Sequence, residues 1–239
     1  MPKRLRVMTY NIHAAKGVDG QCDLPRIADV IRSYNPDLVA LQEVDVGRSR
    51  SGSIDQGHEL GAILGMTAIF APTLERDGGH YGIATLTRLP VTETRQLTLP
   101  LAGHRRSQPR CALVTRHTWD GGDLEMINTH LSVLFRERPG QVAAIAAEMA
   151  GEALVIAGDF NCTPWSPAYK ILARGLKSAT RFARTWPSPA PIVPIDHIFY
   201  RGRLGVVSAG AWTGGPARKA SDHLPVVAEL EHIAIEAAA

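Results

Sequence analysis

The chain has 239 residues, of which 45% are hydrophobic and 21% are charged, and its formal net charge is +3. These values are typical of a globular protein with a substantial core, so we expect one catalytic domain over residues 1–239. The apolar runs are too short to span a bilayer, and three widely spaced cysteines do not make a disulfide framework. Because no apolar leader follows Met1-Pro2-Lys3-Arg4, we expect a cytoplasmic protein without a transmembrane segment.

The basic residues are concentrated in the stretch "HRRSQPR", which supplies Arg105, Arg106 and Arg110. Together with Arg136 and Arg138, these side chains can attract an anionic substrate. Each of them is equally well explained as a solvated arginine on a surface loop. Charge therefore favours a phosphate-bearing substrate but does not choose between nucleic acid and lipid.

The first third of the chain predicts strands alternating with helices. Residues 5–12 alternate as a strand does, and residues 38–44 form a second strand. Between them, Asp23 is placed to cap a helix that ends at Asn35-Pro36. The apolar stripe of this helix consists of Leu24, Ile27, Val30, Ile31 and Tyr34. A short helix around Glu59–Leu64 follows.

The middle of the chain reads as one strand after another. We expect strands near residues 66–70, 81–87, 91–99, 111–119 and 124–131, with a hairpin turn at Asp120-Gly121-Gly122. A helix opens at Pro139, and a strand at 153–158, a short helix at 167–173 and strands at 195–200, 206–211 and 225–230 complete the chain. Many strands with few helices favour an α+β fold in which two sheets pack face to face and the helices lie outside.

Polar side chains lie at the ends of these predicted strands. The stretches concerned are "TYNIH", "LQEVD", "INTHL", "GDFN", "IDH" and "SDH". A buried carboxylate costs several kcal/mol unless it is paired or bound to a metal. One such acid would be explained by a cap or a salt bridge, but so many at strand ends predict a shared site.

The residue types indicate phosphoester chemistry. Asn11, Glu43 and Asp222 offer oxygen ligands of the kind that a hard divalent cation takes, and no Cys/His spacing suggests zinc. His223 beside Asp196 can be held in one tautomer. Asp159 with Asn161 could bind and deprotonate a water. Such a set suits in-line attack on a phosphoryl group, where negative charge develops and must be neutralised.

The ordered motifs "TYNIH", "LQEVD", "YGIATLTRLPV", "INTHLSV", "GDFNCTP", "IDHIFY" and "SDHLPVVAEL" resemble those of the endonuclease/exonuclease/phosphatase superfamily, from Val7 to about Leu230. The resemblance implies a four-layered αββα sandwich with two mainly antiparallel sheets. It also implies cleavage of phosphate esters with Mg²⁺ or Mn²⁺ bound at one edge of the sheets.

The resemblance also implies roles for single residues. Glu43 would be the principal metal ligand, with Asn11 and Asp222 close by. Asp159 would activate the water, and Asn161 would hold it and a phosphate oxygen. His223, partnered by Asp196, and His130 would be the phosphate-facing histidines. Tyr81, Arg88 and Arg110 lie in matching segments without an assigned role.

Other features leave the substrate open. Ile83 and Gln108 depart from the family pattern, while "LQEVD" and "GDFN" resemble the branch of sphingomyelinase-like phosphodiesterases and small bacterial proteins. We expect a phosphate-ester substrate (a lipid headgroup, a small phosphodiester or nucleic acid) and no obligate protein partner. One alternative is a DNA or RNA nuclease, and another is a catalytically inactive binding module. Cys162 is interpreted as a small filler, and Trp165 and Trp186 as loop-packing residues rather than a substrate rim.

Overall fold

The computed structural model describes residues 3–233. In chain order its elements are β1 (Arg4–Asn11), η1 (His13–Ala15), α1 (Leu24–Tyr34), β2 (Leu38–Val46), η2 (Ser49–Ser51), α2 (Gln56–Leu64), β3 (Thr67–Arg76), β4 (Gly79–Thr87), β5 (Val91–Thr98), β6 (Cys111–Trp119), β7 (Gly122–His130), α3 (Arg138–Ala147), β8 (Ala153–Asp159), α4 (Pro167–Leu172), β9 (Lys177–Ser178), β10 (Asp196–Arg201), β11 (Leu204–Ala211), α5 (Ala217–Ala220) and β12 (Val226–His232).

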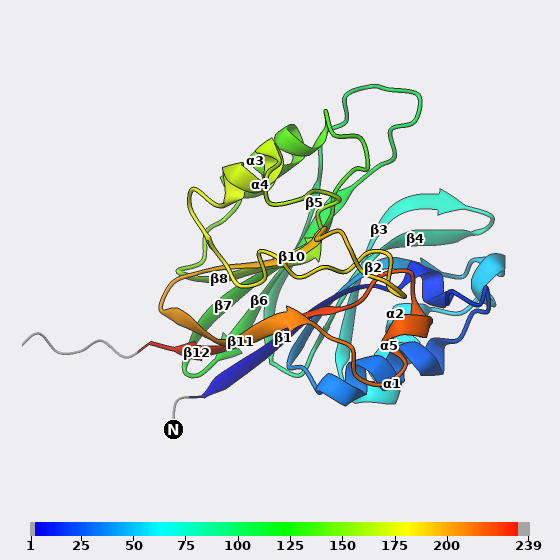
Figure 1. Cartoon of the computed structure of the whole chain (residues 1–239), viewed down its shortest axis with the longest axis horizontal. Helices are drawn as coiled ribbons and strands as arrows, with labels where there is room; N and C mark the ends of the chain where they lie inside the picture. Colours follow the sequence, from blue (N-terminus) through cyan, green and yellow to red (C-terminus); the bar gives the residue numbers. More distant parts are fainter. Residues whose placement is uncertain (1–2, 234–239) are drawn as a thin grey trace, which may run out of the picture.

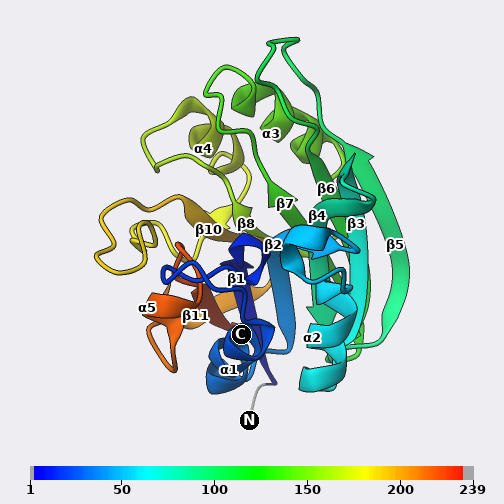
Figure 2. The same ribbon diagram turned by 90° about the vertical axis from the view of Figure 1, so that its right-hand side faces the viewer.

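Two six-stranded sheets pack face to face, with helices on both outer faces (Figures 1 and 2). The first sheet has the strand order β11-β12-β1-β2-β4-β3, and the second has the order β5-β6-β7-β8-β10-β9. The pairs β1–β2 and β7–β8 are parallel, and all other neighbours in the two sheets are antiparallel. The predicted four-layered αββα sandwich with mainly antiparallel sheets is therefore confirmed.

Alternate side chains of β1 belong to two different layers of the core. Leu5 and Val7 face the space between the sheets, where they pack in one apolar cluster with Val155 of β8. Met8 and Tyr10 point to the other side, into the cluster formed with α1 and α2. A third apolar cluster lies between the second sheet and the helices α3 and α4. Burial on both faces explains why the central strands are almost continuously apolar.

Local capping sets the helix bounds. The Asp23 carboxylate accepts a hydrogen bond from the Arg26 N–H at 2.9 Å, so α1 begins where predicted. The second helix begins at Gln56, earlier than predicted, because Asp55 caps it by accepting from the His58 N–H at 2.9 Å. No helix within residues 3–233 has the length and apolar character needed to cross a membrane.

The strand directions place several chain segments at one edge of the sandwich. The parallel pairing of β1 with β2 ends at Asn11 and Gln42, next to Glu43, while β7 and β8 end at His130 and Asp159. The antiparallel neighbour β10 begins at the same edge, since its first residue, Asp196, pairs with Asp159. Parallel pairing within each sheet thus gathers the polar strand ends on which function depends.

Candidate functional site

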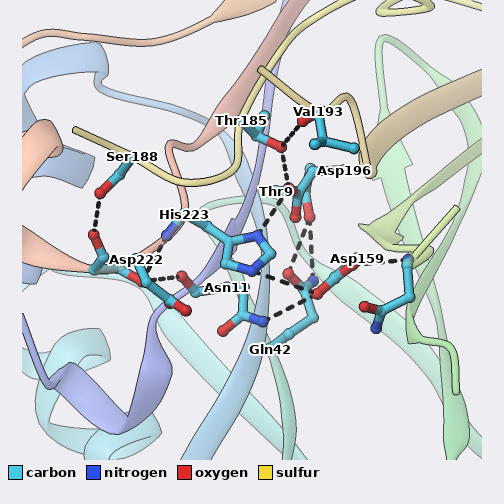
Figure 3. Close-up of polar contacts among 12 residues, drawn as sticks. Thr9, Asn11, Gln42, Asp159, Thr185, Ser188, Val193, Asp196, Asp222 and His223 are labelled. Atoms are coloured by element: carbon cyan, nitrogen blue, oxygen red, sulfur yellow. Dashed lines mark hydrogen bonds and ion pairs between the residues drawn. The ribbon is translucent and has the colours of Figure 1, made fainter. Parts of the chain in front are cut away.

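Asp159, the last residue of β8, lies at the centre of the polar strand ends (Figure 3). Its carboxylate is buried, and its Oδ2 accepts a hydrogen bond from Asn11 Nδ2 at 3.1 Å. The same Asn11 nitrogen lies 3.0 Å from Glu43 Oε1. Residues from both sheets, far apart in the sequence, are therefore joined through one amide group.

Glu43 owes its orientation to a β-bulge. The register between β2 and β4 shifts between Gln42 and Val44, and Glu43 has a left-handed φ of 59°. A bulge places an extra residue in one strand and redirects its side chain. Glu43 consequently lines the pocket beside Asp159, while its neighbours Gln42 and Val44 stay buried. The sequence identified the residue but not the bulge.

His223 and Asp196 form a buried pair, as the sequence predicts. His223 Nδ1 lies 2.9 Å from Asp196 Oδ2, and Thr185 Oγ1 donates to the same oxygen. Burial alone would lower the pKa of His223, but Asp196, Asp159 and Asp222 together outweigh it and raise that pKa to about 10. The ring is therefore a cation at neutral pH, and its Nε2 lies 3.9 Å from Asp159 Oδ2.

The pKa of Asp159 is raised to about 7, first by burial and then by the nearby charge of Asp196. Asp159 Oδ1 accepts from the backbone N–H of Asn161 at 2.8 Å, which holds the carboxylate in place. Asn161 has a left-handed φ of 48°, and its side-chain amide donates to Leu131 O at 3.0 Å. A carboxylate with a pKa near neutrality suits a general base.

His130 is positioned by Arg110, for which the sequence indicates only a possible attraction of an anionic substrate. Arg110 Nη1 lies 3.1 Å from His130 Nδ1, and both side chains are buried. A guanidinium can only donate, so Nδ1 accepts and Nε2 carries the imidazole proton. That Nε2 lies 3.5 Å from Asp159 Oδ2. Burial, Arg110 and His223 lower the pKa of His130 well below its usual value, and the ring stays neutral.

A buried amide cluster supports the site from below and was not predicted. Gln42 Nε2 donates to Asn128 Oδ1 at 2.9 Å and reaches Thr9 Oγ1 at 3.1 Å. Asn128 Nδ2 in turn donates to the carbonyls of Leu41 and Ala84. These contacts tie the second sheet to the first directly beneath Asp159. Gln42 and Asn128 each stand beside apolar residues of a predicted strand, in "LQEVD" and "INTHL". An amide side chain at such a position is the signal from which a buried hydrogen-bonded cluster could have been predicted.

The three predicted metal ligands are only partly brought together. Asn11 and Glu43 are in contact, whereas Asp222 is linked to Asn11 through Ser221, whose hydroxyl donates to Asn11 O at 2.7 Å and lies 3.3 Å from Asp222 Oδ1. A different set converges more tightly. Ligand atoms of Asp159, Asp196 and His223 all lie within 4.8 Å of one another, and this group could hold a metal ion with the His223 ring in its neutral form.

A pocket of about 680 Å³ opens above these residues. Its polar floor consists of Glu43, His130, Asp159, Asn161 and His223, with Tyr81 beside it. Trp186 lines this pocket and is 41% exposed. Trp165 lies outside the lining and packs against Phe182, with ring centroids 6.2 Å apart, so loop packing describes Trp165. The filler Cys162 is buried, as expected.

The basic residues are divided between the pocket and other places. Arg106 and Arg110 line the pocket, whereas Arg138 donates to the carbonyl of Asn161. The Arg136 guanidinium lies over the ring of Phe135, and Arg88 Nε donates to the carbonyl of Pro36 at 3.3 Å. Of the arginines predicted to attract an anionic substrate, Arg106 and Arg110 line the pocket, and the others do not.

Comparisons with known proteins agree with this geometry. Residues 8–223 match the model of the endonuclease/exonuclease/phosphatase family. The uncharacterized protein YbhP of Escherichia coli K12 is 27% identical over 248 residues, covering 94% of this chain and 95% of that protein.

Solved structures share the fold. An endonuclease/exonuclease/phosphatase from Beutenbergia cavernae superposes with a TM-score of 0.79 at 26% identity, over 99% of this chain and 73% of the other. The catalytic domain of human Nocturnin, solved with bound sulfate, gives a TM-score of 0.74 at 24% identity, over 98% and 96%. With the motifs, the sandwich and the family match in agreement, the chain belongs to the endonuclease/exonuclease/phosphatase family of phosphohydrolases.

Proposed function

We propose that this chain is one catalytic domain, residues 1–239, that hydrolyses phosphodiesters with a divalent metal ion, Mg²⁺ or Mn²⁺. The observation that carries the proposal is the position of Asp159. It is a buried carboxylate with a pKa of about 7, and it contacts Asn11, His130 and the cationic His223 at the floor of an open pocket. Such an arrangement suits proton transfer next to a developing negative charge.

The donor set fits a hard cation. Glu43 and Asp159 each direct a carboxylate oxygen to Asn11 Nδ2, at 3.0 and 3.1 Å. The Asn11 amide therefore lies between two carboxylates, and a hard cation would be stabilised in that position. Turning the Asn11 amide would offer an oxygen there instead. In addition, the buried Asp196 Oδ1 has no hydrogen-bond partner within residues 3–233. Glu43 and Asn11 would hold the ion, with Asp222 as an outer ligand.

A bound metal ion would supply positive charge to the phosphoryl oxygens of the substrate. Asp159 accepts the proton of the attacking water, and Asn161 orients that water beside it. His223, kept cationic by Asp196, opposes the negative charge that builds on the phosphoryl group. His130 donates a hydrogen bond from Nε2, because Arg110 holds its Nδ1 as an acceptor. Each role uses an atom that lies at the pocket floor.

The cellular setting is part of the same proposal. Cys22 is exposed, Cys111 and Cys162 are buried, and all three are free thiols. Free cysteines are usual in a reducing compartment, which supports a place in the cytoplasm.

Hydrolysis of bis(p-nitrophenyl) phosphate and p-nitrophenyl phosphate, with Mg²⁺ or Mn²⁺ and with a chelator, tests the proposal. We expect turnover of the diester that a chelator abolishes and that added metal restores. Faster turnover of the monoester would identify a phosphatase instead. Digestion of single- or double-stranded DNA at a higher kcat/KM than the diester would identify a nuclease, and metal binding without any turnover would indicate a binding module.

A further inference from the structure

The turn after β8 carries Asn161 in a constrained backbone conformation. Asn161 has a left-handed φ of 48°, which is uncommon for residues other than glycine. Its backbone N–H donates to Asp159 Oδ1 at 2.8 Å, and its side-chain amide donates to Leu131 O at 3.0 Å. Both contacts depend on the position of the turn. A conformation of this kind persists where the surrounding structure holds it, so the groups that surround the turn matter for the site.

Two side chains hold this turn from outside the pocket. Arg138, the first residue of α3, donates from Nη1 to the carbonyl oxygen of Asn161. His197, the second residue of β10, has its Nε2 2.8 Å from the carbonyl oxygen of Cys162. Two successive carbonyl groups are therefore each bound by a side chain from a different element. Neither Arg138 nor His197 lines the pocket, so any effect of theirs on the reaction passes through the turn.

The surroundings of the His197 ring are apolar apart from this one contact. The ring is fully buried and packs against Phe160, Tyr169 and Phe199, with ring centroids 5.7, 4.9 and 6.0 Å apart. A carbonyl oxygen only accepts, so Nε2 carries the proton and Nδ1 is left as an acceptor. In the described part of the chain that Nδ1 has no hydrogen-bond partner. A buried polar atom without a partner costs free energy, and a phenylalanine would fill this space without that cost. The contact with Cys162 is therefore what a histidine provides here.

The strand β10 supports the site from both of its faces. Its first residue, Asp196, binds His223 on the side of the site. Successive side chains of a strand point to opposite faces of the sheet. His197 accordingly points to the outer face of the second sheet, where α4 packs (Figure 2). One strand thus fixes the partner of His223 on one face and the turn of Asn161 on the other.

From these contacts we infer that His197 is a positioning residue for phosphoester hydrolysis and that it acts together with Arg138. Their hydrogen bonds fix the turn of Asn161 and Cys162, and the Asn161 N–H then holds the Asp159 carboxylate. This inference rests on the proposed function and deepens it, because Asp159 and Asn161 are the groups assigned to the attacking water. Loss of either contact should slow the chemical step and leave substrate binding nearly unchanged.

His197→Phe tests the contact with Cys162, because the variant keeps a ring in the aromatic cluster and loses the donor. We expect kcat for bis(p-nitrophenyl) phosphate to fall about tenfold, with KM changed less than about twofold. His197→Gln should recover most of this loss, since a glutamine Nε2 can donate where the histidine Nε2 does. Tyr169→Phe, in the same cluster, is the matched control and should keep the parental kcat. Parental kcat in His197→Phe, or no recovery in His197→Gln, would overturn the inference.

Arg138→Met tests the same turn from α3. The methionine keeps an apolar stem but removes the donor to the carbonyl of Asn161. We expect kcat to fall as it does in His197→Phe, again with little change in KM. Arg174→Met, at an exposed position after α4, should behave as the parent does. An Arg138→Met enzyme with the same kcat as the Arg174→Met control would contradict the shared role.

Hydrogen–deuterium exchange separates this inference from the proposed function, because it requires no turnover. In His197→Phe and in Arg138→Met, the amides of residues 160–163 should exchange about tenfold faster than in the parent, whereas those of residues 154–158 in β8 should not change. Faster exchange at the turn, together with a parent that hydrolyses no phosphodiester, would contradict the proposed function and leave the contacts to the turn supported. Parental exchange at the turn in both variants would overturn the inference, whatever the activity.

Discussion

His223 Nδ1 lies 2.9 Å from Asp196 Oδ2, and both side chains are buried at the edge where the two sheets meet. The imidazole comes from the segment before β12 of the first sheet, and the carboxylate opens β10 of the second. A buried ion pair costs desolvation of both partners and is stable only with further hydrogen bonds. Thr185 provides one of these to Asp196. The pair therefore forms only when the two sheets pack together, and it is this pairing that keeps the His223 ring positively charged.

Replacing one partner of this pair should impair turnover more than binding. In Asp196→Asn the side chain keeps its shape but loses the charge that stabilises the His223 cation. We expect kcat for bis(p-nitrophenyl) phosphate to fall about a hundredfold or more, with KM changed by much less. Steady-state kinetics measure this. Asp29→Asn, at an exposed position on α1, is the matched control, and an Asp196→Asn enzyme as active as that control would contradict the role of the pair.

Glu43 is expected to be the main holder of the divalent cation. Glu43→Gln retains a hydrogen-bonding side chain at the bulge but removes one of the two carboxylates that approach Asn11. Calorimetric titration with Mn²⁺ should show affinity weakened by about tenfold or more, because even outer-shell changes at metal sites cost that much. Glu59→Gln, on the exposed face of α2, should bind Mn²⁺ as the parent does. Equal affinities in all three proteins would place the ion elsewhere.

His117 makes the fold sensitive to acid. The ring is buried between the sheets and contacts Thr115 Oγ1 at 2.8 Å, and burial lowers its pKa to about 4. The unfolded chain, with a pKa near 6.5, binds more protons between those two values. The free energy of unfolding therefore falls as the pH falls through that window, by at most about 2 kcal/mol at pH 5 from this group.

Denaturant unfolding at pH 7 and pH 5 checks this effect. His117→Gln should lose less stability than the parent over that interval, because its side chain does not titrate. The exposed His58→Gln should lose as much as the parent. If His117→Gln shows the same loss as the parent, burial of His117 does not contribute to acid sensitivity.

Gly158 is needed for the close pairing of β7 with β8. A Cβ at this position would lie 2.0 Å from the backbone oxygen of Thr129, which cannot move without separating the two strands. Gly158→Ala should lower the free energy of unfolding by about 1–3 kcal/mol or more. Gly210→Ala, on β11 with open space around it, should change stability by less than ~0.5 kcal/mol. Denaturant titration of both variants compares them, and equal stabilities would show that the strands adapt.

Strands and helix starts were predictable where a local signal controls them. The alternation of β1 and the Asp23 cap of α1 are examples, because both depend on residues close in sequence. The two-residue β9 and the single-turn α5 were not predicted, since tertiary pairing and packing rather than local propensity determine such short elements. Ile83, which departs from the family pattern, lies in the buried core, as an apolar residue in a predicted strand should.

The composition of the site was more predictable than its geometry. Polar residues at strand ends indicated Asp159 and His223, and the structure brings these together. The sequence did not reveal that Arg110 controls the tautomer of His130, because the two residues meet only through the pairing of neighbouring strands. Nor did it reveal that Ser221 links Asp222 to the backbone of Asn11, since the position of the loop before β12 is a tertiary property.

The most direct test of the account is the activity of Asp159→Asn in the metal-dependent hydrolysis of bis(p-nitrophenyl) phosphate. The amide has the shape of the carboxylate but cannot take a proton from water. We predict that kcat falls by a factor of about 10²–10⁴, the contribution of general base catalysis. Asp123→Asn, an exposed change in β7, should keep parental turnover. Parental turnover by Asp159→Asn would contradict the claim that Asp159 activates the water.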